Sequence, residues 1–207
     1  MNLKAEKILK FIVAFNCICI IFISFTGCHS ISEKDNKSEK NNSESVLAIE
    51  TPSGLKADNH EIFSVDVTIS ELGSEIYPAM SMCIDFDASN LEFTGIEDGN
   101  VFVTGDTADG KFPEWKVNTE LSNKTGQINI MYLDTSGGRY AFSDKLLDKD
   151  KSILLRLDFC LRDSVKSGDT YEISVQDAVF AVSDSEKSLA STSGTLTIQN
   201  GKIILED

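Results

Sequence analysis

The sequence predicts an all-β protein, a sandwich or barrel built from short strands. Three observations carry this prediction: apolar and polar residues alternate within short segments, turn-forming residues separate these segments, and no stretch repeats its apolar residues at a sustained helical interval. Only residues 141–148 have a pattern that fits a single helical turn. With 207 residues, 41% of them hydrophobic, the chain can bury a core, and its length suits one domain rather than two.

The first four strands are expected at residues 46–50, 61–70, 77–86 and 91–96. In the second strand the apolar side chains share one face, at Phe63, Val65, Val67 and Ile69. The third strand has two contrasting faces. One is apolar, at Met80, Met82, Ile84 and Phe86, and the other carries smaller or polar side chains, at Ala79, Ser81, Cys83 and Asp85.

The remaining strands follow with the same alternation. Residues 112–117 predict a weaker fifth strand and residues 127–133 a clear sixth. Residues 152–161 show the cleanest pattern, and residues 171–175 with 178–182 predict an eighth strand that is bent or split. At the end, 194–199 and 202–205 flank Asn200-Gly201, the pair favoured in a type I′ turn, and predict a terminal hairpin.

The N-terminus has the pattern of an export signal. Three lysines among the first ten residues precede a 15-residue apolar run at 11–25, which is short for a membrane-spanning helix. The run ends at Phe25-Thr26-Gly27-Cys28, which resembles the lipobox of bacterial lipoproteins, although Leu is usual at the position of Phe25. The resemblance implies that residues 1–27 are a lipoprotein signal peptide and that Cys28 carries a lipid. An uncleaved anchor or ordinary signal cleavage is the alternative.

Residues 28–45 contain Cys28 and then a charged stretch in which Ile31 is the one apolar residue. Such a stretch cannot bury enough apolar surface to order itself, so we expect a flexible linker. The domain is then expected at 46–207. It would be exported and held at the outer face of a bacterial cell membrane by its N-terminal lipid anchor alone.

Composition and motifs disfavour several function classes. The chain carries 33 acidic and 19 basic residues, a net charge of −14, whereas nucleic-acid binders cluster Lys and Arg. Its two histidines, His29 and His60, leave little room for a His-based metal site or a catalytic triad. No G-x-S-x-G, H-E-x-x-H, paired C-x-x-C or phosphate-binding glycine loop occurs. We therefore expect no enzyme, no cofactor and no nucleic-acid partner.

The order of several short motifs resembles that of cohesin domains. The segment Phe86-Asp87-Ala88-Ser89-Asn90-Leu91-Glu92 is similar to the aromatic-Asp-x-x-x-Leu-Glu turn that follows the third cohesin strand. Further matches come in the expected order, at 126–130, 134–138, 150, 153–161, 166–170 and 175–180. The resemblance extends over roughly 46–205. It implies a nine-stranded antiparallel β-sandwich with jelly-roll topology, a fold related to that of a carbohydrate-binding module.

Cohesins bind dockerin modules of secreted polysaccharide-degrading enzymes, and the dockerin docks on the flat sheet that contains strands 3, 5, 6 and 8. In this sequence the resemblance implies a partner-binding face on the third and sixth strands and the following loop, at Ala79, Ser81, Cys83, Asp85, Asn129, Met131, Leu133, Asp134, Ser136 and Gly137. Such a mixture of apolar, small and acidic groups suits a helix laid across a sheet. The usual polar residue of strand 3 is replaced by Ala79 and Ser81, and an ordinary solvated sheet face is the alternative.

Other candidate sites have structural interpretations that fit better. Cys83 and Cys160 are expected to be free thiols, because the cohesin topology places their strands in different sheets. Trp115 and Tyr140 fit core packing or loop anchoring better than a sugar-stacking platform. The acidic loops 97–99, 106–110 and 148–150 are more typical of solvated turns than of calcium sites. Asp87, close to Asp85, fits a turn-capping acid better than one of a glycosidase pair.

Two functions from different classes follow. The first is a non-catalytic, scaffolding lipoprotein of the cell surface that captures dockerin-type modules of secreted polysaccharide-degrading proteins. The second is a carbohydrate- or cell-wall-binding lipoprotein that uses the same sandwich. The sixth strand, with Met131 and Leu133 but no aromatic row, favours the first. A third, weaker hypothesis is a cohesin-like lipoprotein that has lost dockerin recognition.

Overall fold

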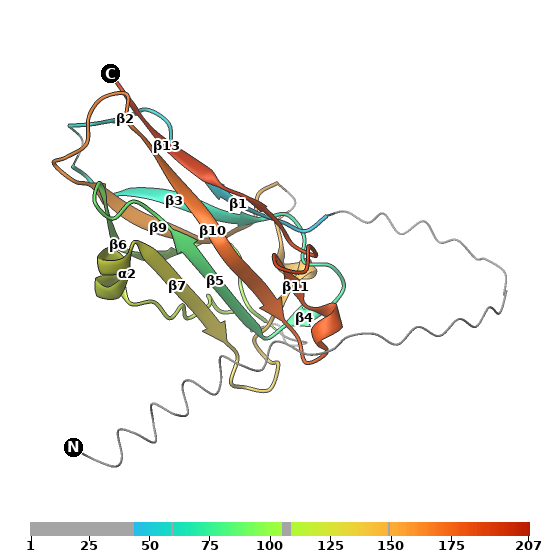
Figure 1. The fold of residues 1–207 in the computed structure, drawn as a ribbon. Helices are drawn as coiled ribbons and strands as arrows, with labels where there is room; N and C mark the ends of the chain where they lie inside the picture. Colours follow the sequence, from blue (N-terminus) through green and yellow to red (C-terminus); the bar gives the residue numbers. More distant parts are fainter. Residues whose placement is uncertain (1–43, 59, 105–108, 149) are drawn as a thin grey trace, which may run out of the picture. The chain divides into compact units, whose positions relative to one another are not determined.

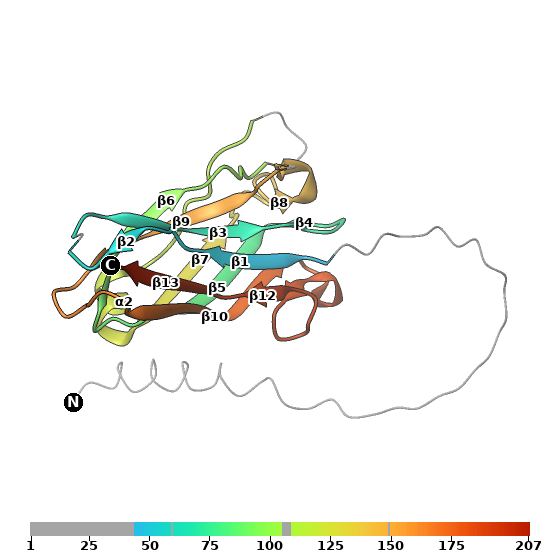
Figure 2. The ribbon, with the colours of Figure 1, turned by 90° about the horizontal axis from the view of Figure 1, so that it is seen from above.

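The computed structural model describes residues 44–58, 60–104, 109–148 and 150–207. The expected signal peptide at 1–27, the lipidation site Cys28 and the linker up to residue 43 lie outside the described residues, as do parts of the acidic loops 106–110 and 148–150. The described part forms two β-sheets packed face to face, as Figures 1 and 2 show from two directions. The expected β-sandwich is confirmed. Within these ranges, no helix has the length and apolarity needed to span a membrane.

The first sheet has the strand order β12-β1-β3-β9-β6. These strands span Thr197–Gln199, Val46–Glu50, Phe63–Ile69, Ile153–Leu161 and Leu91–Asp98. The second sheet has the order β2-β13-β10-β5-β7. Its strands span Leu55–Lys56, Gly201–Glu206, Thr170–Ala181, Ala79–Asp85 and Gln127–Leu133.

Of three further short strands, one joins the second sheet and two form a separate two-stranded sheet. β11 (Leu189–Ala190) pairs with β10, and β4 (Ile76–Tyr77) pairs with β8 (Phe142–Ser143). The strand pairs are antiparallel except β1 with β12 and β13 with β2, which are parallel. These two edge pairs depart from the wholly antiparallel pairing that was expected, and the two-residue strands add to the expected nine.

Alternate side chains of both sheets fill the space between the layers. The inward side chains of β3 and β5 are those that the sequence alternation predicted, and β7 alternates in the same way. All of these side chains are buried: Phe63, Val65, Val67, Ile69, Met80, Met82, Ile84, Ile128, Ile130 and Tyr132. Aromatic rings connect the layers, since Phe86 meets Phe159 of β9 edge to face with their centroids 5.4 Å apart. Burial of this apolar surface is the main favourable term in folding, and it leaves the opposite face of β5 and β7 toward solvent.

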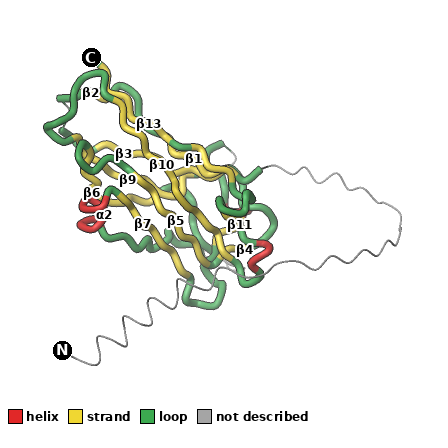
Figure 3. The backbone as a smooth tube through the Cα atoms, in the orientation of Figure 1, coloured by secondary structure: helices red, strands yellow, loops and turns green. Residues whose placement is uncertain are grey.

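A short helix that the sequence analysis did not predict precedes β7. α2 spans Thr119–Thr125, and Figure 3 shows it beside β6 and β7. The Asn118 side chain accepts a hydrogen bond from the N–H of Leu121, and Gly126 ends the helix in the left-handed conformation with φ of 72°. Seven residues are too few to show a helical period, so these two caps were the available signal. The turn expected within 141–148 is present as the 3-10 helix η1 (Asp144–Leu146).

Two expected strand arrangements are wrong. Residues 112–117 form no strand, and only an isolated bridge joins Lys116 to Met131. The terminal hairpin is also absent, because β12 pairs with β1 in the first sheet and β13 pairs with β10 in the second. The Asn200 side chain accepts a hydrogen bond from the N–H of Val175 at 3.0 Å. The Asn200-Gly201 pair therefore marks a crossing between layers, where contacts with both sheets override the local turn preference.

The expected eighth strand is one continuous strand, β10, with a β-bulge between Val175 and Asp177. The extra residue, Gln176, has no partner on β5, so the alternation of inward and outward side chains reverses there. Ser174 and Asp177 consequently lie on the same outer face although three positions separate them. The strand is bent rather than split.

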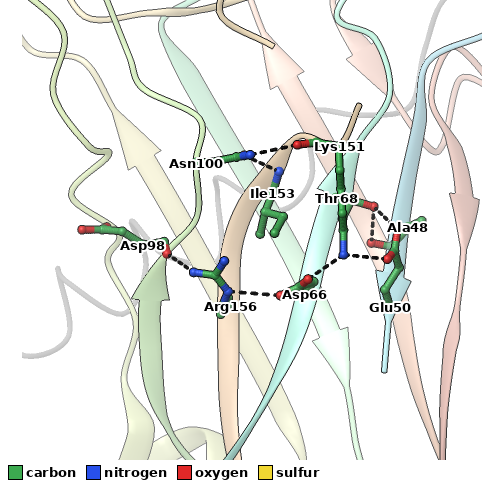
Figure 4. Close-up of polar contacts among 9 residues, drawn as sticks. All are labelled: Ala48, Glu50, Asp66, Thr68, Asp98, Asn100, Lys151, Ile153 and Arg156. Atoms are coloured by element: carbon green, nitrogen blue, oxygen red, sulfur yellow. Dashed lines mark hydrogen bonds and ion pairs between the residues drawn. The ribbon is translucent and has the colours of Figure 1, made fainter. Parts of the chain in front are cut away.

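Paired charges cover part of the outer face of the first sheet (Figure 4). The Lys151 Nζ lies 2.8 Å from a Glu50 carboxylate oxygen and 2.7 Å from one of Asp66. The other oxygen of Asp66 lies 3.2 Å from the Arg156 Nε, and Arg156 donates to the backbone carbonyl of Asp98 at 2.9 Å. Such mutually neutralised surface charges are typical of a solvated face. The outer face of the second sheet is built differently.

Candidate partner-binding face

Side chains of three neighbouring strands form the sheet face, by which we mean the outward surface of β7, β5 and β10 in the second sheet. Strand pairing aligns these side chains in four rows across the strands. Read from β7 through β5 to β10, the rows are Leu133-Ala79-Ala181, Met131-Ser81-Val179, Asn129-Cys83-Asp177 and Gln127-Asp85-Ser174. Seven of the ten residues that the sequence assigned to partner binding are therefore brought together on one surface.

The first two rows form the apolar half of the sheet face. Leu133 is 60% exposed and Met131 is 54% exposed, although both are large apolar side chains on a regular strand. Beside them, Ala79, Ser81 and Ala181 are small, so the backbone of a partner can come close to the sheet. Contiguous exposed apolar groups of this kind are typical of interaction sites, whereas single exposed ones are not informative.

The other two rows form the acidic half of the sheet face. Asp85 is half-buried, and one of its oxygens accepts a hydrogen bond from the Gln127 side-chain amide at 3.0 Å. Asp177 is exposed, and one of its oxygens accepts a hydrogen bond from the Ser191 hydroxyl at 3.0 Å. Within the described ranges neither carboxylate has a Lys, Arg or His as an ion-pair partner. Burial, and then the negative charges of Asp85 and Asp177, raise the pKa of the intervening Cys83 thiol.

Lys116 adds a positive charge at the rim of the apolar half. Its backbone bridge to Met131 holds it against the outer edge of β7. Lys116 also lines a shallow depression of about 260 Å³ that reaches Ser81, Cys83 and Asp177. A wider groove of about 590 Å³ continues from Met131 and Leu133 toward the loop after β7. Glu114 and Asp134 also line this groove, but Glu114 is paired with Lys111 at 3.4 Å and the Asp134 carboxylate accepts hydrogen bonds from its own loop. The sheet face is thus polarised, with apolar groups at one end, two carboxylates without a cation among the described residues at the other, and Lys116 at its β7 edge.

Asp134 organises the loop that follows β7. One of its oxygens accepts hydrogen bonds from the Ser136 N–H at 2.8 Å and the Ser136 hydroxyl at 2.6 Å. The other accepts from the N–H of Gly138 at 2.7 Å and of Tyr140 at 3.2 Å. Burial opposes ionisation of Asp134, but these hydrogen bonds outweigh it and hold the pKa of the carboxyl below its ordinary value. Gly137 has a φ of 80°, which favours glycine. Asp134 and Ser136 thus fix the loop beside Leu133.

The resemblance placed the eighth strand in the docking sheet but assigned no residue on it, and the structure adds Ser174, Asp177, Val179 and Ala181 of β10 to the sheet face. The strand itself was predicted, but the bulge at Gln176 breaks the period that would have connected its two outward segments. The polar pair Gln176-Asp177 inside an apolar strand was the available signal of that bulge.

Trp115 and Tyr140 have the structural roles that the sequence favoured. The Trp115 ring stacks on Phe142 with centroids 5.9 Å apart and contributes to the edge of the core. Tyr140 is half-buried, and the Lys111 Nζ lies over its ring at 4.6 Å from the centroid. Each ring is thus covered on one face by a neighbouring side chain, and the two do not form a row.

The remaining candidates are also structural. Cys83 and Cys160 are free thiols on strands of different sheets, as expected. Asp87 caps the turn after β5, because its carboxylate accepts from the Ser89 N–H at 2.9 Å and the Asn90 side-chain amide at 2.7 Å. No group of three or more His, Cys, Asp or Glu in the described part of the chain is placed to hold a metal ion.

Two packed sheets, one with an open and partly apolar outer face, define this chain as a β-sandwich module. The chain belongs to the cohesin family, since the model of the cohesin domain matches residues 46–198. Among curated proteins no match is significant.

Solved cohesin structures have the same fold. One of them is the third ScaC cohesin of Acetivibrio cellulolyticus, solved in complex with a ScaB dockerin that carries a mutation in its C-terminal helix. It is 17% identical to this chain, with a TM-score of 0.56, and the match covers 79% of this chain and 99% of that chain. The OlpA cohesin of Clostridium thermocellum, solved in complex with Doc918, is 14% identical with a TM-score of 0.54 and the same two coverages. A non-cellulosomal cohesin of the archaeon Archaeoglobus fulgidus is 12% identical with a TM-score of 0.51, over 80% of this chain and 93% of that chain.

Proposed function

We propose that this chain is a non-catalytic scaffolding lipoprotein of the cell surface, whose cohesin domain captures dockerin-type modules of secreted polysaccharide-degrading proteins. The observation that carries the proposal is the exposed pair Met131 and Leu133 on an open, regular sheet face. Membership of the cohesin family supports it, and two of the similar cohesins were solved with a dockerin bound.

The dimensions of the sheet face suit a partner helix. Neighbouring strands lie about 4.8 Å apart, so three strands make a strip about 10 Å wide between their axes. An α-helix with its side chains is about 10 Å across. Met131 and Leu133 would supply apolar contact, the small Ala79 and Ala181 would allow close approach, and the carboxylates would select the partner by charge.

The N-terminal region belongs to the same proposal. The lipobox-like segment Phe25-Thr26-Gly27-Cys28 and the charged residues that follow it support export, lipidation at Cys28 and retention at the outer face of a bacterial cell membrane. A module on such a tether would gather its partners near the envelope, and the lipid would be its one contact with the membrane.

The carbohydrate-binding alternative gains no support from the described residues. Trp115 packs on Phe142. The exposed aromatic pair Phe102 and Phe112 has ring centroids 4.4 Å apart and planes inclined by 30°. At that separation the two rings cover one another, whereas a sugar-stacking row requires free ring faces side by side. A glycan array nevertheless belongs in the test, because it is the readout that would favour this alternative.

The test measures binding by the full chain, purified in mild detergent and immobilised. The analytes are the ScaB dockerin, Doc918 and the secreted proteins of the source organism, each with calcium and with a chelator. Capture of dockerin-bearing proteins is expected. Capture of none would remove the proposal, and glycan binding without a protein partner would assign the chain to the carbohydrate-binding alternative.

A matched pair of variants locates the site. Met131→Asp should weaken dockerin binding on the order of 100-fold, because it places a charge in the apolar half without touching the core. Ile204→Asp is the control, since Ile204 has the same 54% exposure but lies on β13, opposite the far end of β10. Equal effects of the two substitutions would show that the partner binds elsewhere.

A further inference from the structure

We infer that the sheet face selects a polarised partner helix, with an apolar anchor near one end and a Lys or Arg two to three helical turns away, bound in one direction along the strands. The inference rests on the proposed function, because it specifies the partner of the same face.

The order of the rows sets the length and direction of the partner. Side chains on one face of a strand recur about every 6.8 Å, so four rows cover about 20 Å along the strands. A helix of about 14 residues has this length. The centres of the apolar and acidic halves are two rows, or about 14 Å, apart, which corresponds to about nine residues of a helix.

The acidic half requires a cation from its partner. Asp85 and Asp177 each accept one hydrogen bond from a neutral side chain, at 3.0 Å in both cases, and neither is paired with a cation among the described residues. A neutral or acidic helix over these carboxylates would remove the water that hydrates them and supply no cation in its place, which costs free energy. A Lys or Arg at that position would form a charge-assisted hydrogen bond instead.

The apolar half disfavours the reversed orientation. A helix turned end for end would place its cation over Met131 and Leu133, close to Lys116, which has no ion pair within the described ranges. The two carboxylates that line this end are already engaged, Glu114 by Lys111 and Asp134 by its own loop. The reversed helix would also place its apolar anchor over Asp85 and Asp177. Both placements leave charges without partners, so the order of the rows discriminates between the two directions.

The experiment sorts a yeast-displayed library of Doc918, with its exposed helix positions randomised, against the full chain in mild detergent. Binders should carry Lys or Arg about 7–11 residues from an apolar side chain. Against the double variant Asp85→Lys/Asp177→Lys, the same positions should enrich Asp or Glu. The original binders should lose on the order of 10- to 100-fold in affinity for this variant.

A charge-matched control separates local from overall electrostatics. Glu97→Lys/Asp150→Lys changes the net charge equally, but Glu97 lies on β6 of the first sheet and Asp150 precedes β9. Binding to this control should stay within about twofold, a difference of about 0.4 kcal/mol. If the variant Asp85→Lys/Asp177→Lys does not fold, the neutral substitution Asp177→Asn at the exposed position replaces it. The original binders should then lose about fivefold in affinity.

The outcomes distinguish the inference from the proposed function. Selected helices without an enrichment of Lys or Arg, or with the same enrichment against Asp85→Lys/Asp177→Lys, would overturn the inferred polarity of the partner helix. Either result would leave the proposed capture of dockerins intact. Binders that tolerate Met131→Asp would show that another surface is used and would overturn the inference as well. A library without any binder would remove both the inference and the proposed function.

Discussion

Lys116 and Met131 exchange two backbone hydrogen bonds, in which the Lys116 N–H donates to the Met131 carbonyl at 2.8 Å and the Met131 N–H donates to the Lys116 carbonyl at 3.1 Å. This isolated bridge covers part of the outer edge of β7, whose backbone groups would otherwise be open to another strand. It also fixes the backbone beside Met131, the residue on which we centre the candidate site.

The bridge predicts the effect of Lys116→Pro. Proline has no N–H, so one of the two hydrogen bonds is lost, and we expect a destabilisation of about 1–2 kcal/mol together with faster hydrogen exchange at the Met131 amide. Urea unfolding and native-state hydrogen exchange measure the two effects. Lys116→Ala keeps the backbone bonds and is the control. Unchanged protection of the Met131 amide in the proline variant would contradict the prediction.

Asp134 predicts a pH dependence of stability. Because the loop hydrogen bonds lower the pKa of Asp134 in the folded state, its stabilisation is present above the unfolded pKa of about 3.9 and is lost as the pH falls through the lower folded value. Asp134→Asn should therefore cost about 1–2 kcal/mol near neutral pH and less near pH 3. The measurement is urea unfolding at both pH values. Asp150→Asn, at an exposed position, serves as the control, and an equal pH response of the two variants would count against this role.

Gly99 predicts a steric effect at the end of β6. A Cβ at this position would lie 1.8 Å from the Ile153 carbonyl oxygen, so the two backbones have to separate. Gly99→Ala should destabilise the fold by about 2–3 kcal/mol. Gly95 is the matched position on β6, because a Cβ there has nothing within 4 Å. Gly95→Ala should change the free energy of unfolding by less than about 0.5 kcal/mol, and similar losses for both variants would refute the steric explanation.

The proposed lipid anchor predicts a change in localisation. Expressed with its own signal in a bacterial host, the chain should partition into a detergent phase and carry a diacylglycerol thioether on Cys28 that mass spectrometry detects. Cys28→Ser removes the thiol that would be modified, so this variant should lose the lipid mass. Retention of both the lipid mass and the partition would exclude Cys28 as the modified residue.

Local patterns predicted most of the strands and the inward faces of several of them. Met80, Met82 and Ile84 alternate along five residues of sequence, and the side-chain period of a strand sends all three to one face regardless of what lies opposite. The helix α2 escaped prediction because its caps, Asn118 and Gly126, enclose too few residues for a period. The type I′ preference of Asn200-Gly201 was a correct local propensity that tertiary contacts overrode.

The sequence by itself determined an all-β sandwich or barrel and the inward faces of several strands, since these depend on a period of two that a single segment displays. The β5 and β7 side of the candidate face came from the resemblance of the ordered motifs to cohesins. Only the tertiary structure decided that Ser81 lies between Met131 and Val179, and Cys83 between Asn129 and Asp177. These neighbours come from distant parts of the chain, and strand pairing together with one bulged residue sets their register. The division of the face into an apolar and an acidic half is therefore a property of the sheet, because no single strand contains it.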